Sequence, residues 1–183
     1  MLRPITAIAC LAALTACASD QTASNAGMAG RNAAAAAMAA PAAPDYVMMA
    51  GASDLFEIQS SQVALQKTQN AEIRAFAQMM IDHHTQTSAE VMAAAKAAGL
   101  NPAPPALPAD KQQKIAMLQS TAAAGFDAAY MREQLAGHSE ALALHQSYAA
   151  NGDAAPLKRV ASKAVPIVET HLTRARTLAG SAR

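Results

Sequence analysis

The sequence predicts an all-α domain, an antiparallel four-helix bundle in which the third helix is kinked or split. Alanine, leucine, methionine, glutamine and glutamate dominate residues 45–183, and no stretch alternates apolar and polar residues as a strand does. Helix-ending residues recur at intervals of about one helix length. Four long amphipathic segments with short connections are typical of an antiparallel bundle, and the length is that of one domain.

Each predicted helix has an identifiable start. The first begins near Asp45, or near Asp54 with Glu57 three residues later in the spacing of a capping box, and ends at about Lys67. The later helices are expected to span residues 70–98, 110–121, 126–150 and 153–178.

Caps, glycines and prolines set the boundaries of these later helices. Asn70 is an N-cap residue, and Gly99 with the following NPAPPALP ends the second helix. The third is interrupted at Gly125, which either kinks one long helix or separates two. Asn151-Gly152 is its stop, and Pro166 bends the last helix because it removes one backbone hydrogen bond.

The N-terminal residues predict export. Arg3 followed by the apolar run ITAIACLAALTA is typical of a signal peptide over residues 1–16. The tetrapeptide LTAC resembles a bacterial lipobox, so Cys17 would become the lipidated first residue of a protein on the outer membrane, facing the periplasm. The alternative is cleavage after Ala18, which releases a soluble periplasmic protein. Residues 17–44 are expected to be an alanine-rich flexible tether spanning about 30 Å.

Cysteine and charge exclude several function classes. Cys10 and Cys17 both precede the folded domain, so the domain has no disulfide and no thiolate metal site. Arg3 is the only charged residue before Cys17, so the mature chain has zero net charge and we expect no nucleic-acid partner. The expected partner is a membrane, through the lipid on Cys17. No Ser-His-Asp set, phosphate loop or Cys-His dyad occurs, so the sequence assigns no enzymatic activity.

Three histidines lie on the core-facing stripes of three different helices. At 100° per residue, His84, His138 and His171 each share a face with apolar residues of their own helix, whereas His83 is expected at the boundary or in solvent. A single core histidine is usually just hydrogen-bonded. Three that converge either bond to one another and to nearby carboxylates or share a ligand. His84 and His138 are expected at similar depth, with His171 up to two turns, about 10 Å, away.

The possible donor atoms favour zinc or copper over a di-iron centre. Di-iron bundles need Glu-x-x-His on two helices, and the residues three before the histidines are Ile81, Leu135 and Val168. Imidazoles, with Glu57 or Asp127 as an added carboxylate, suit zinc, copper or nickel. Each carboxylate also has another explanation, because Glu57 closes a capping box and Asp127 orients an imidazole. Methionines at helical spacing are more typical of core filler than of copper ligands.

Three stretches together resemble one known family. They are AFAQMMIDHHTQTSAEVMAAAKAAGL, AGFDAAYMREQLAGHSEALALHQSYAANGD and AVPIVETHLTRARTLAG, and the resemblance covers about residues 45–180 in order. The family is the ferritin-like bacterial envelope family known as domain of unknown function 4142. Its recurring positions correspond to His83-His84, Phe126-Asp127 with His138, Pro166 with His171-Leu172, and Glu57 in the first helix.

The resemblance implies a helical bundle in the periplasm or outer membrane and brings no established activity. His83 stands where the family often has aspartate. A shorter stretch, MIDHHTQTSAEVMA, is also similar to the methionine-histidine-histidine helix of another small bacterial bundle family associated with copper-rich contexts. That family repeats the motif, whereas this chain has it once.

Two functions remain open from the sequence. The first is an envelope lipoprotein that binds or buffers a divalent metal through His84, His138 and His171. The second is a tethered structural or stress-related bundle without catalytic activity, in which the same histidines form a buried hydrogen-bond network that fixes helix register.

Overall fold

The structure is a computed structural model that describes residues 40–181, all within one compact unit, Met38–Arg183. The described residues form five α-helices and no strand, which confirms the all-α prediction. The helices are α2 (Ala43–Lys67), α3 (Ala71–Ala97), α4 (Ala109–Ser120), α5 (Ala123–Asn151) and α6 (Ala155–Ser181).

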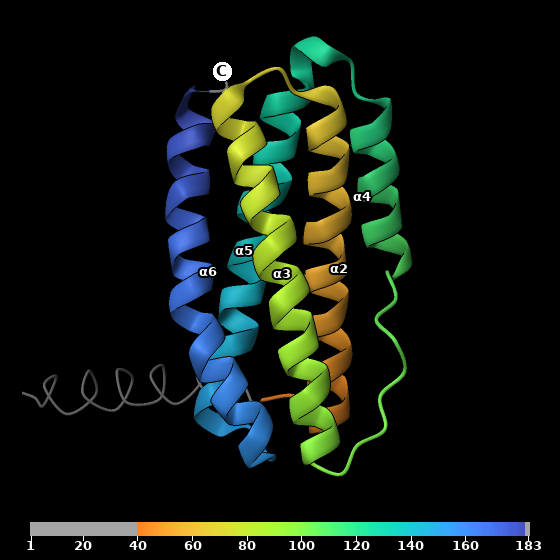
Figure 1. The fold of residues 1–183 in the computed structure, drawn as a ribbon, viewed down its shortest axis with the longest axis vertical. Helices are drawn as coiled ribbons and strands as arrows, with labels where there is room; N and C mark the ends of the chain where they lie inside the picture. Colours follow the sequence, from red (N-terminus) through yellow and green to blue (C-terminus); the bar gives the residue numbers. More distant parts are fainter. Residues whose placement is uncertain (1–39, 182–183) are drawn as a thin grey trace, which may run out of the picture. The chain divides into compact units, whose positions relative to one another are not determined.

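Four long helices lie side by side as a bundle, and the short α4 lies against its outside (Figure 1). α2 and α6 each contact both α3 and α5, whereas α4 contacts α2 and α5. α2 and α6 run in one direction and α3 and α5 in the other (Figure 1). The parallel pair, α3 and α5, is possible because residues 98–108 and α4 carry the chain back along the bundle before α5 begins.

The finer prediction, a four-helix bundle with a kinked or split third helix, is not confirmed. The segment predicted as one interrupted helix forms two helices that run in opposite directions, α4 and α5 (Figure 1). The break falls at Thr121 and Ala122, whereas Gly125 lies inside the first turn of α5. The connection from α3 to α4 is long, so the prediction of short connections holds only for the other turns.

Local sequence explains where these helices begin and end. The Asn70 side-chain oxygen accepts hydrogen bonds from the backbone N–H groups of Glu72 (2.9 Å) and Ile73 (3.3 Å), as an N-cap does. Gly99 has a φ of 80°, the left-handed conformation that favours glycine after a helix. Pro44 lies in the first turn of α2, where its missing N–H breaks no helical hydrogen bond.

The first helix takes the earlier of its two predicted starts. α2 begins at Ala43, so a start near Asp54 is wrong: Asp54 and Glu57 lie inside the helix, and Asp54 is not an N-cap. The predicted signal peptide at residues 1–16, Cys17 and the tether as far as residue 39 lie outside the described residues. Within the described range, no helix has both the length and the apolar character needed to cross a bilayer.

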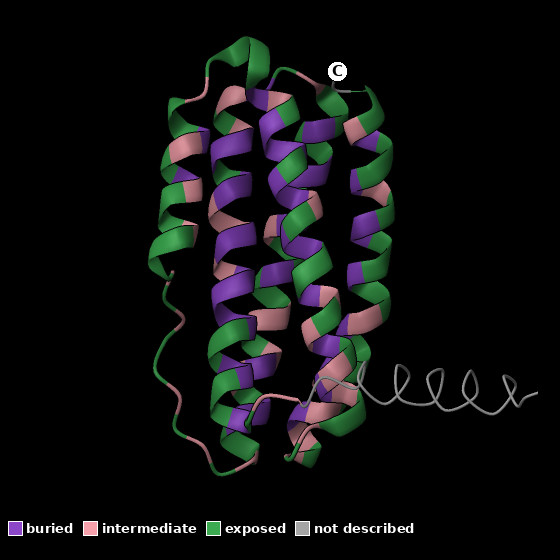
Figure 2. Cartoon of the chain, turned by 180° about the vertical axis from the view of Figure 1, so that it is seen from behind, coloured by how far each residue is buried: buried purple, intermediate pink, exposed green. Residues whose placement is uncertain are grey.

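Buried residues follow the inward faces of the long helices (Figure 2). They form two apolar clusters with a polar layer between them. One cluster includes Phe56, Phe76, Phe126 and Leu178, and the other includes Tyr46, Val91, Tyr148 and Leu157. Between the clusters, each long helix turns a buried polar side chain inward. These side chains are Asp54 of α2, His84 of α3, His138 of α5 and His171 of α6.

Candidate functional site

Three imidazoles from three helices meet in this polar layer. His84, His138 and His171 expose 4%, 1% and 1% of their surface. Their ring centroids are separated by 5.5, 5.4 and 5.3 Å, so the rings form a nearly equilateral triangle, hereafter the histidine triangle. One nitrogen of each ring lies within 4.8 Å of one nitrogen of each of the others. The two-turn offset expected for His171 is therefore not observed.

The His84 ring is oriented by a carboxylate on α2. Its Nδ1 lies 2.8 Å from Asp54 Oδ1, which also accepts a hydrogen bond of 3.1 Å from the Thr87 hydroxyl. Burial alone would lower the pKa of His84, but the hydrogen bond to Asp54 and the charges of Asp54 and Glu57 raise it above the ordinary value. His84 Nε2 is buried and has no hydrogen-bond partner. In the neutral ring this nitrogen carries a free lone pair.

The His138 tautomer follows from a backbone contact. Its Nδ1 lies 2.8 Å from the carbonyl oxygen of Gln134, which can only accept, so Nδ1 carries the proton in the neutral ring. The lone pair is then on Nε2, which lies 3.4 Å from His171 Nδ1. Burial lowers the pKa of His138 despite the opposing charge of Glu57. A neutral His138 therefore presents its lone pair to the triangle.

His171 connects the triangle to a fourth histidine. Its Nε2 lies 2.8 Å from Nδ1 of His83, and the two rings are nearly parallel, at 23°. Burial, with the positive charge that His84, His138 and His83 can carry, lowers the pKa of His171 to about 3. His83 is exposed, as predicted, but its contact with His171 was not predicted from the sequence.

Glu57 is a buried carboxylate without a hydrogen bond. It exposes 1% of its surface, and neither side-chain oxygen has a partner. Its Oε1 lies 3.7 Å from His138 Nδ1. Gly137 makes room for it, because a Cβ at that position would lie only 2.5 Å from Oε1. Glu57 thus faces the protonated edge of His138 rather than the triangle's lone pairs, and it is not one of the three grouped donors.

Asp127 is not brought to the site. It is partly buried near the start of α5, eleven residues and therefore about 16 Å along the helix from His138. Asp54 takes the orienting role that the sequence prediction gave to Asp127. A helix starting near Asp45 places Asp54 within that helix, but no local feature of the sequence indicates its contact with His84.

A second buried histidine contact lies further along α5. His145 Nδ1 is 3.0 Å from the Tyr46 hydroxyl, and burial lowers the pKa of His145. Tyr46 stacks on Tyr148, with ring centroids 3.9 Å apart. These contacts join α2 to α5. His145 is not one of the three histidines whose nitrogens are grouped as possible metal ligands.

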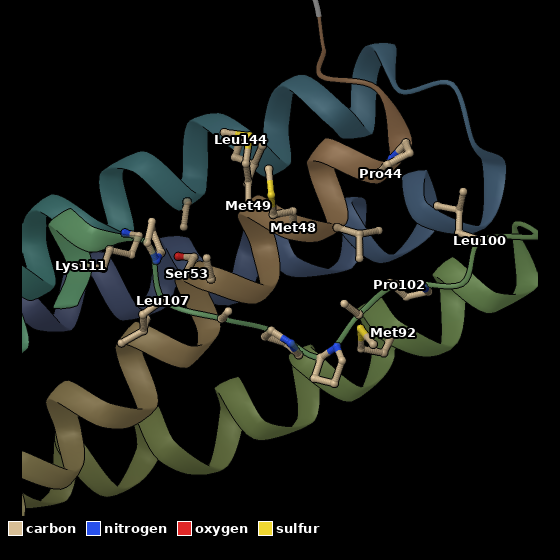
Figure 3. A pocket seen from close by; sticks show the side chains of 18 of the residues that line it. Pro44, Met48, Met49, Ser53, Met92, Leu100, Pro102, Leu107, Lys111 and Leu144 are labelled. Atoms are coloured by element: carbon tan, nitrogen blue, oxygen red, sulfur yellow. The ribbon is translucent and has the colours of Figure 1, made fainter.

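One cavity has none of the triangle's residues in its lining. Its volume is about 950 Å³, and it is bounded by α2, α5 and the proline-rich segment 100–108 (Figure 3). Its lining is mainly apolar and includes Met48, Met49 and Met92, with Lys111 at one end. Lys111 is already paired with Glu140, at 3.7 Å. The cavity lining contains no histidine, so the cavity offers no imidazole ligand for a metal ion.

Comparison with known proteins assigns the chain to a family. Residues 28–178 match the family described as Domain of unknown function (DUF4142). The chain belongs to this family. No curated protein matches this DUF4142 chain in sequence.

The crystal structure of a DUF305 fragment from Deinococcus radiodurans is similar to this DUF4142 chain. The TM-score is 0.64 at 18% sequence identity, over 79% of this chain and 97% of the fragment. At that identity the likeness concerns the fold alone. The fold is thus shared with a domain of another family, and the chemistry must be argued from the residues of this chain.

Proposed function

We propose that this DUF4142 protein binds one zinc or copper ion through His84, His138 and His171. The observation that carries the proposal is the buried Nε2 of His84, which has no partner, on one of three imidazole rings that each place a nitrogen within 4.8 Å of the others. A buried polar atom without a partner is costly, and a metal ion would satisfy it. Imidazole is a preferred ligand of both metals.

Only a small closure of the triangle is needed. Zinc binds imidazole nitrogen at about 2.0–2.1 Å, so two ligands at a tetrahedral angle are about 3.3 Å apart. The nitrogens of His138 and His171 are already 3.4 Å apart. The third ligand, His84, needs to approach by up to about 1.5 Å from the observed limit of 4.8 Å. Three protein ligands leave a fourth position open in tetrahedral geometry.

The surrounding hydrogen bonds suit a metal site. The Asp54 carboxylate orients His84 and the Gln134 carbonyl orients His138, each by accepting the N–H of the ring nitrogen that faces away from the triangle. Binding a metal through His171 Nδ1 would move that ring's proton to Nε2. The Nε2–H group could then donate a hydrogen bond to His83 Nδ1. All three ligands would then have an orienting partner.

The charges also favour a cation. An ionised Glu57 without a hydrogen bond is costly to bury, and Asp54 adds a second carboxylate beside the triangle. A dication at the triangle would offset both charges. This supports a divalent ion more strongly than a purely neutral network.

Elemental analysis of the purified full chain, prepared without chelator, tests the proposal. We expect about one zinc or copper per chain, and none after His84→Ala, His138→Ala and His171→Ala are combined. Circular dichroism checks that the variant is folded. The volume-conserving single variant His84→Gln serves if the triple variant does not fold. Absence of metal from the wild type, with no rise in melting temperature on adding zinc or copper, would refute the proposal.

Asp54→Asn is expected to weaken metal binding by about 10- to 100-fold, since asparagine keeps the size but loses the charge-assisted hydrogen bond that orients His84. Competition with a chelating dye would measure the affinity. Glu57→Gln is the matched control, because it removes a nearby negative charge without breaking a hydrogen bond to a ligand. Equal losses in the two variants would show that charge, not orientation, is what Asp54 contributes.

The cellular setting of this function is part of the same proposal. We place the protein in the cell envelope, exported by residues 1–16 and anchored by a lipid on Cys17, with its four long helices in a ferritin-like arrangement. The single long connection between α3 and α5 supports that arrangement. Mass spectrometry of membrane-extracted protein tests the anchor: an unmodified Cys17, or unchanged membrane association of Cys17→Ala, would rule it out.

A structural role is the second candidate function. The row of contacts from His83 through His171 and His138 to Gln134 can satisfy most of these ring nitrogens without a metal. Such a network would fix the register of α3, α5 and α6. It leaves His84 Nε2 and both Glu57 oxygens unsatisfied, which is why we favour the metal site.

A further inference from the structure

The histidine triangle has one histidine neighbour at the protein surface. His83 is exposed, and its Nδ1 lies 2.8 Å from Nε2 of His171, which is 99% buried. The opposite edge of the His171 ring, at Nδ1, lies 3.4 Å from His138 Nε2. An unbroken row of imidazoles thus leads from solvent into the polar layer.

A buried metal site needs a route from solvent. The row of imidazoles runs from the exposed His83 to the buried triangle, so a route along it would connect the two. His83 and His171 belong to α3 and α6, which contact each other along the bundle. A shallow groove of about 290 Å³ lies between the same two helices, lined in part by Met79, one turn before His83, and by Thr170, next to His171. The α2 side of the triangle is instead closed by the buried side chains of Asp54 and Glu57.

We infer that His83 and His171 form a solvent-facing pair, the capture pair, which first binds the metal ion and then passes it to the triangle. This inference rests on the proposed function and adds a second metal site to it. The two facing nitrogens share one proton in their hydrogen bond. An ion that binds both moves this proton to Nε2 of the exposed His83 ring and needs the nitrogens about 3.3 Å apart, an opening of roughly half an ångström.

His171 is the pivot of the transfer. In the capture pair it uses Nε2, and in the triangle it uses Nδ1, so the ring presents one edge outward and the other inward. In the transfer the ion leaves Nε2 and binds Nδ1, while the proton on Nδ1 moves to Nε2, so the ion passes from the side of His83 to the side of His138. His83 leaves the ion at that step, because it is not among the grouped donors of the buried site.

Stopped-flow mixing of the metal-free full chain with a zinc-loaded chromophoric chelator tests the inference. The variant is His83→Gln, which keeps a hydrogen-bonding group for His171 but is a poor metal ligand. We expect zinc uptake and zinc release to slow together by at least about tenfold, with the equilibrium affinity changed less than about threefold. Asp82→Asn is the matched control, an exposed neighbour on α3 whose carboxylate accepts a hydrogen bond from Gln78, and it should not change either rate.

The outcomes separate the inference from the function on which it rests. Wild-type rates in His83→Gln, with normal zinc binding, would overturn the capture pair and leave the buried site intact. A large loss of affinity with unchanged uptake would also overturn it, since His83 would then only orient His171. If the wild type binds no zinc and no copper, the proposed function fails and the inference fails with it.

Discussion

Gly152→Ala is expected to destabilise the domain by about 2–4 kcal/mol. A Cβ at this position would lie 2.6 Å from both Cε1 and the backbone oxygen of Tyr148. Neither the Tyr148 ring nor its backbone oxygen can move easily. The oxygen accepts the Gly152 N–H at 2.8 Å, and the buried Tyr148 ring stacks on Tyr46 and donates a hydrogen bond to Asp153. Urea denaturation of the metal-free protein would measure the change.

Gly125→Ala is the matched control for this prediction. Gly125 is exposed in the first turn of α5, and a Cβ there would meet only Thr121 Cγ2, at 3.9 Å. Alanine should therefore stabilise the helix by up to about 1 kcal/mol, because glycine loses more backbone entropy. If Gly152→Ala proves as harmless as Gly125→Ala, the close packing of the α5–α6 connection is not as described.

The helices could be predicted because their limits depend on nearby residues. The Asn70 cap and the left-handed Gly99 act within one turn, and both were recognised from sequence. The inward faces of α3, α5 and α6 follow from helical periodicity, which placed His84, His138 and His171 in the interior. Local chemistry and amphipathic pattern therefore predicted the all-α class and the interior positions of these three histidines.

The arrangement of the helices depends on information that is not local. Nothing in the residues around Thr121 distinguishes a kink in one helix from a reversal between two. The reversal makes α3 and α5 parallel and brings their midpoints to one level, where His84 and His138 meet. The expected depth of His171 was inaccurate for the same reason, since helix ends do not coincide with a common plane of the bundle.

The orienting groups were missed because they contact residues far away in sequence. The residue type of Asp54 favours an N-cap position. Only its contact with His84, thirty residues later, shows that it orients that imidazole. Helical periodicity predicts that His83 faces solvent, and its partner His171 lies on another helix. Periodicity assigns a residue to a face but does not identify what lies opposite.

The metal-free protein is expected to lose stability steeply as the pH falls from 7 to 5. His138, His145 and His171 have lowered pKa values in the folded state, mainly because burial disfavours their charged forms. Below pH 6.5 the unfolded chain binds more protons at these positions than the folded protein does. Each such histidine then lowers the unfolding free energy by up to about 1.4 kcal/mol per pH unit, and the three together by up to about 4 kcal/mol per pH unit.

His84 has the opposite sign and acts in a different window. Its pKa is raised in the folded state, so its contribution is fully present below pH 6.5 and is lost as the pH rises through the folded value. It therefore does not offset the loss on the acid side. Stability should be greatest near neutral pH, where His84 can still be charged and the other three rings are neutral in both states.

Urea denaturation at half-unit steps from pH 7.5 to 5 measures this dependence. His171→Gln is the informative variant, because it removes the histidine whose pKa is lowered to about 3. Its stability curve should be flatter than that of the wild type by about 1.4 kcal/mol per pH unit below pH 6. A wild-type curve that stays level between pH 7 and 5 would mean that these imidazoles take up protons in the folded bundle, and the neutral state assigned to His138, His145 and His171 would then be wrong.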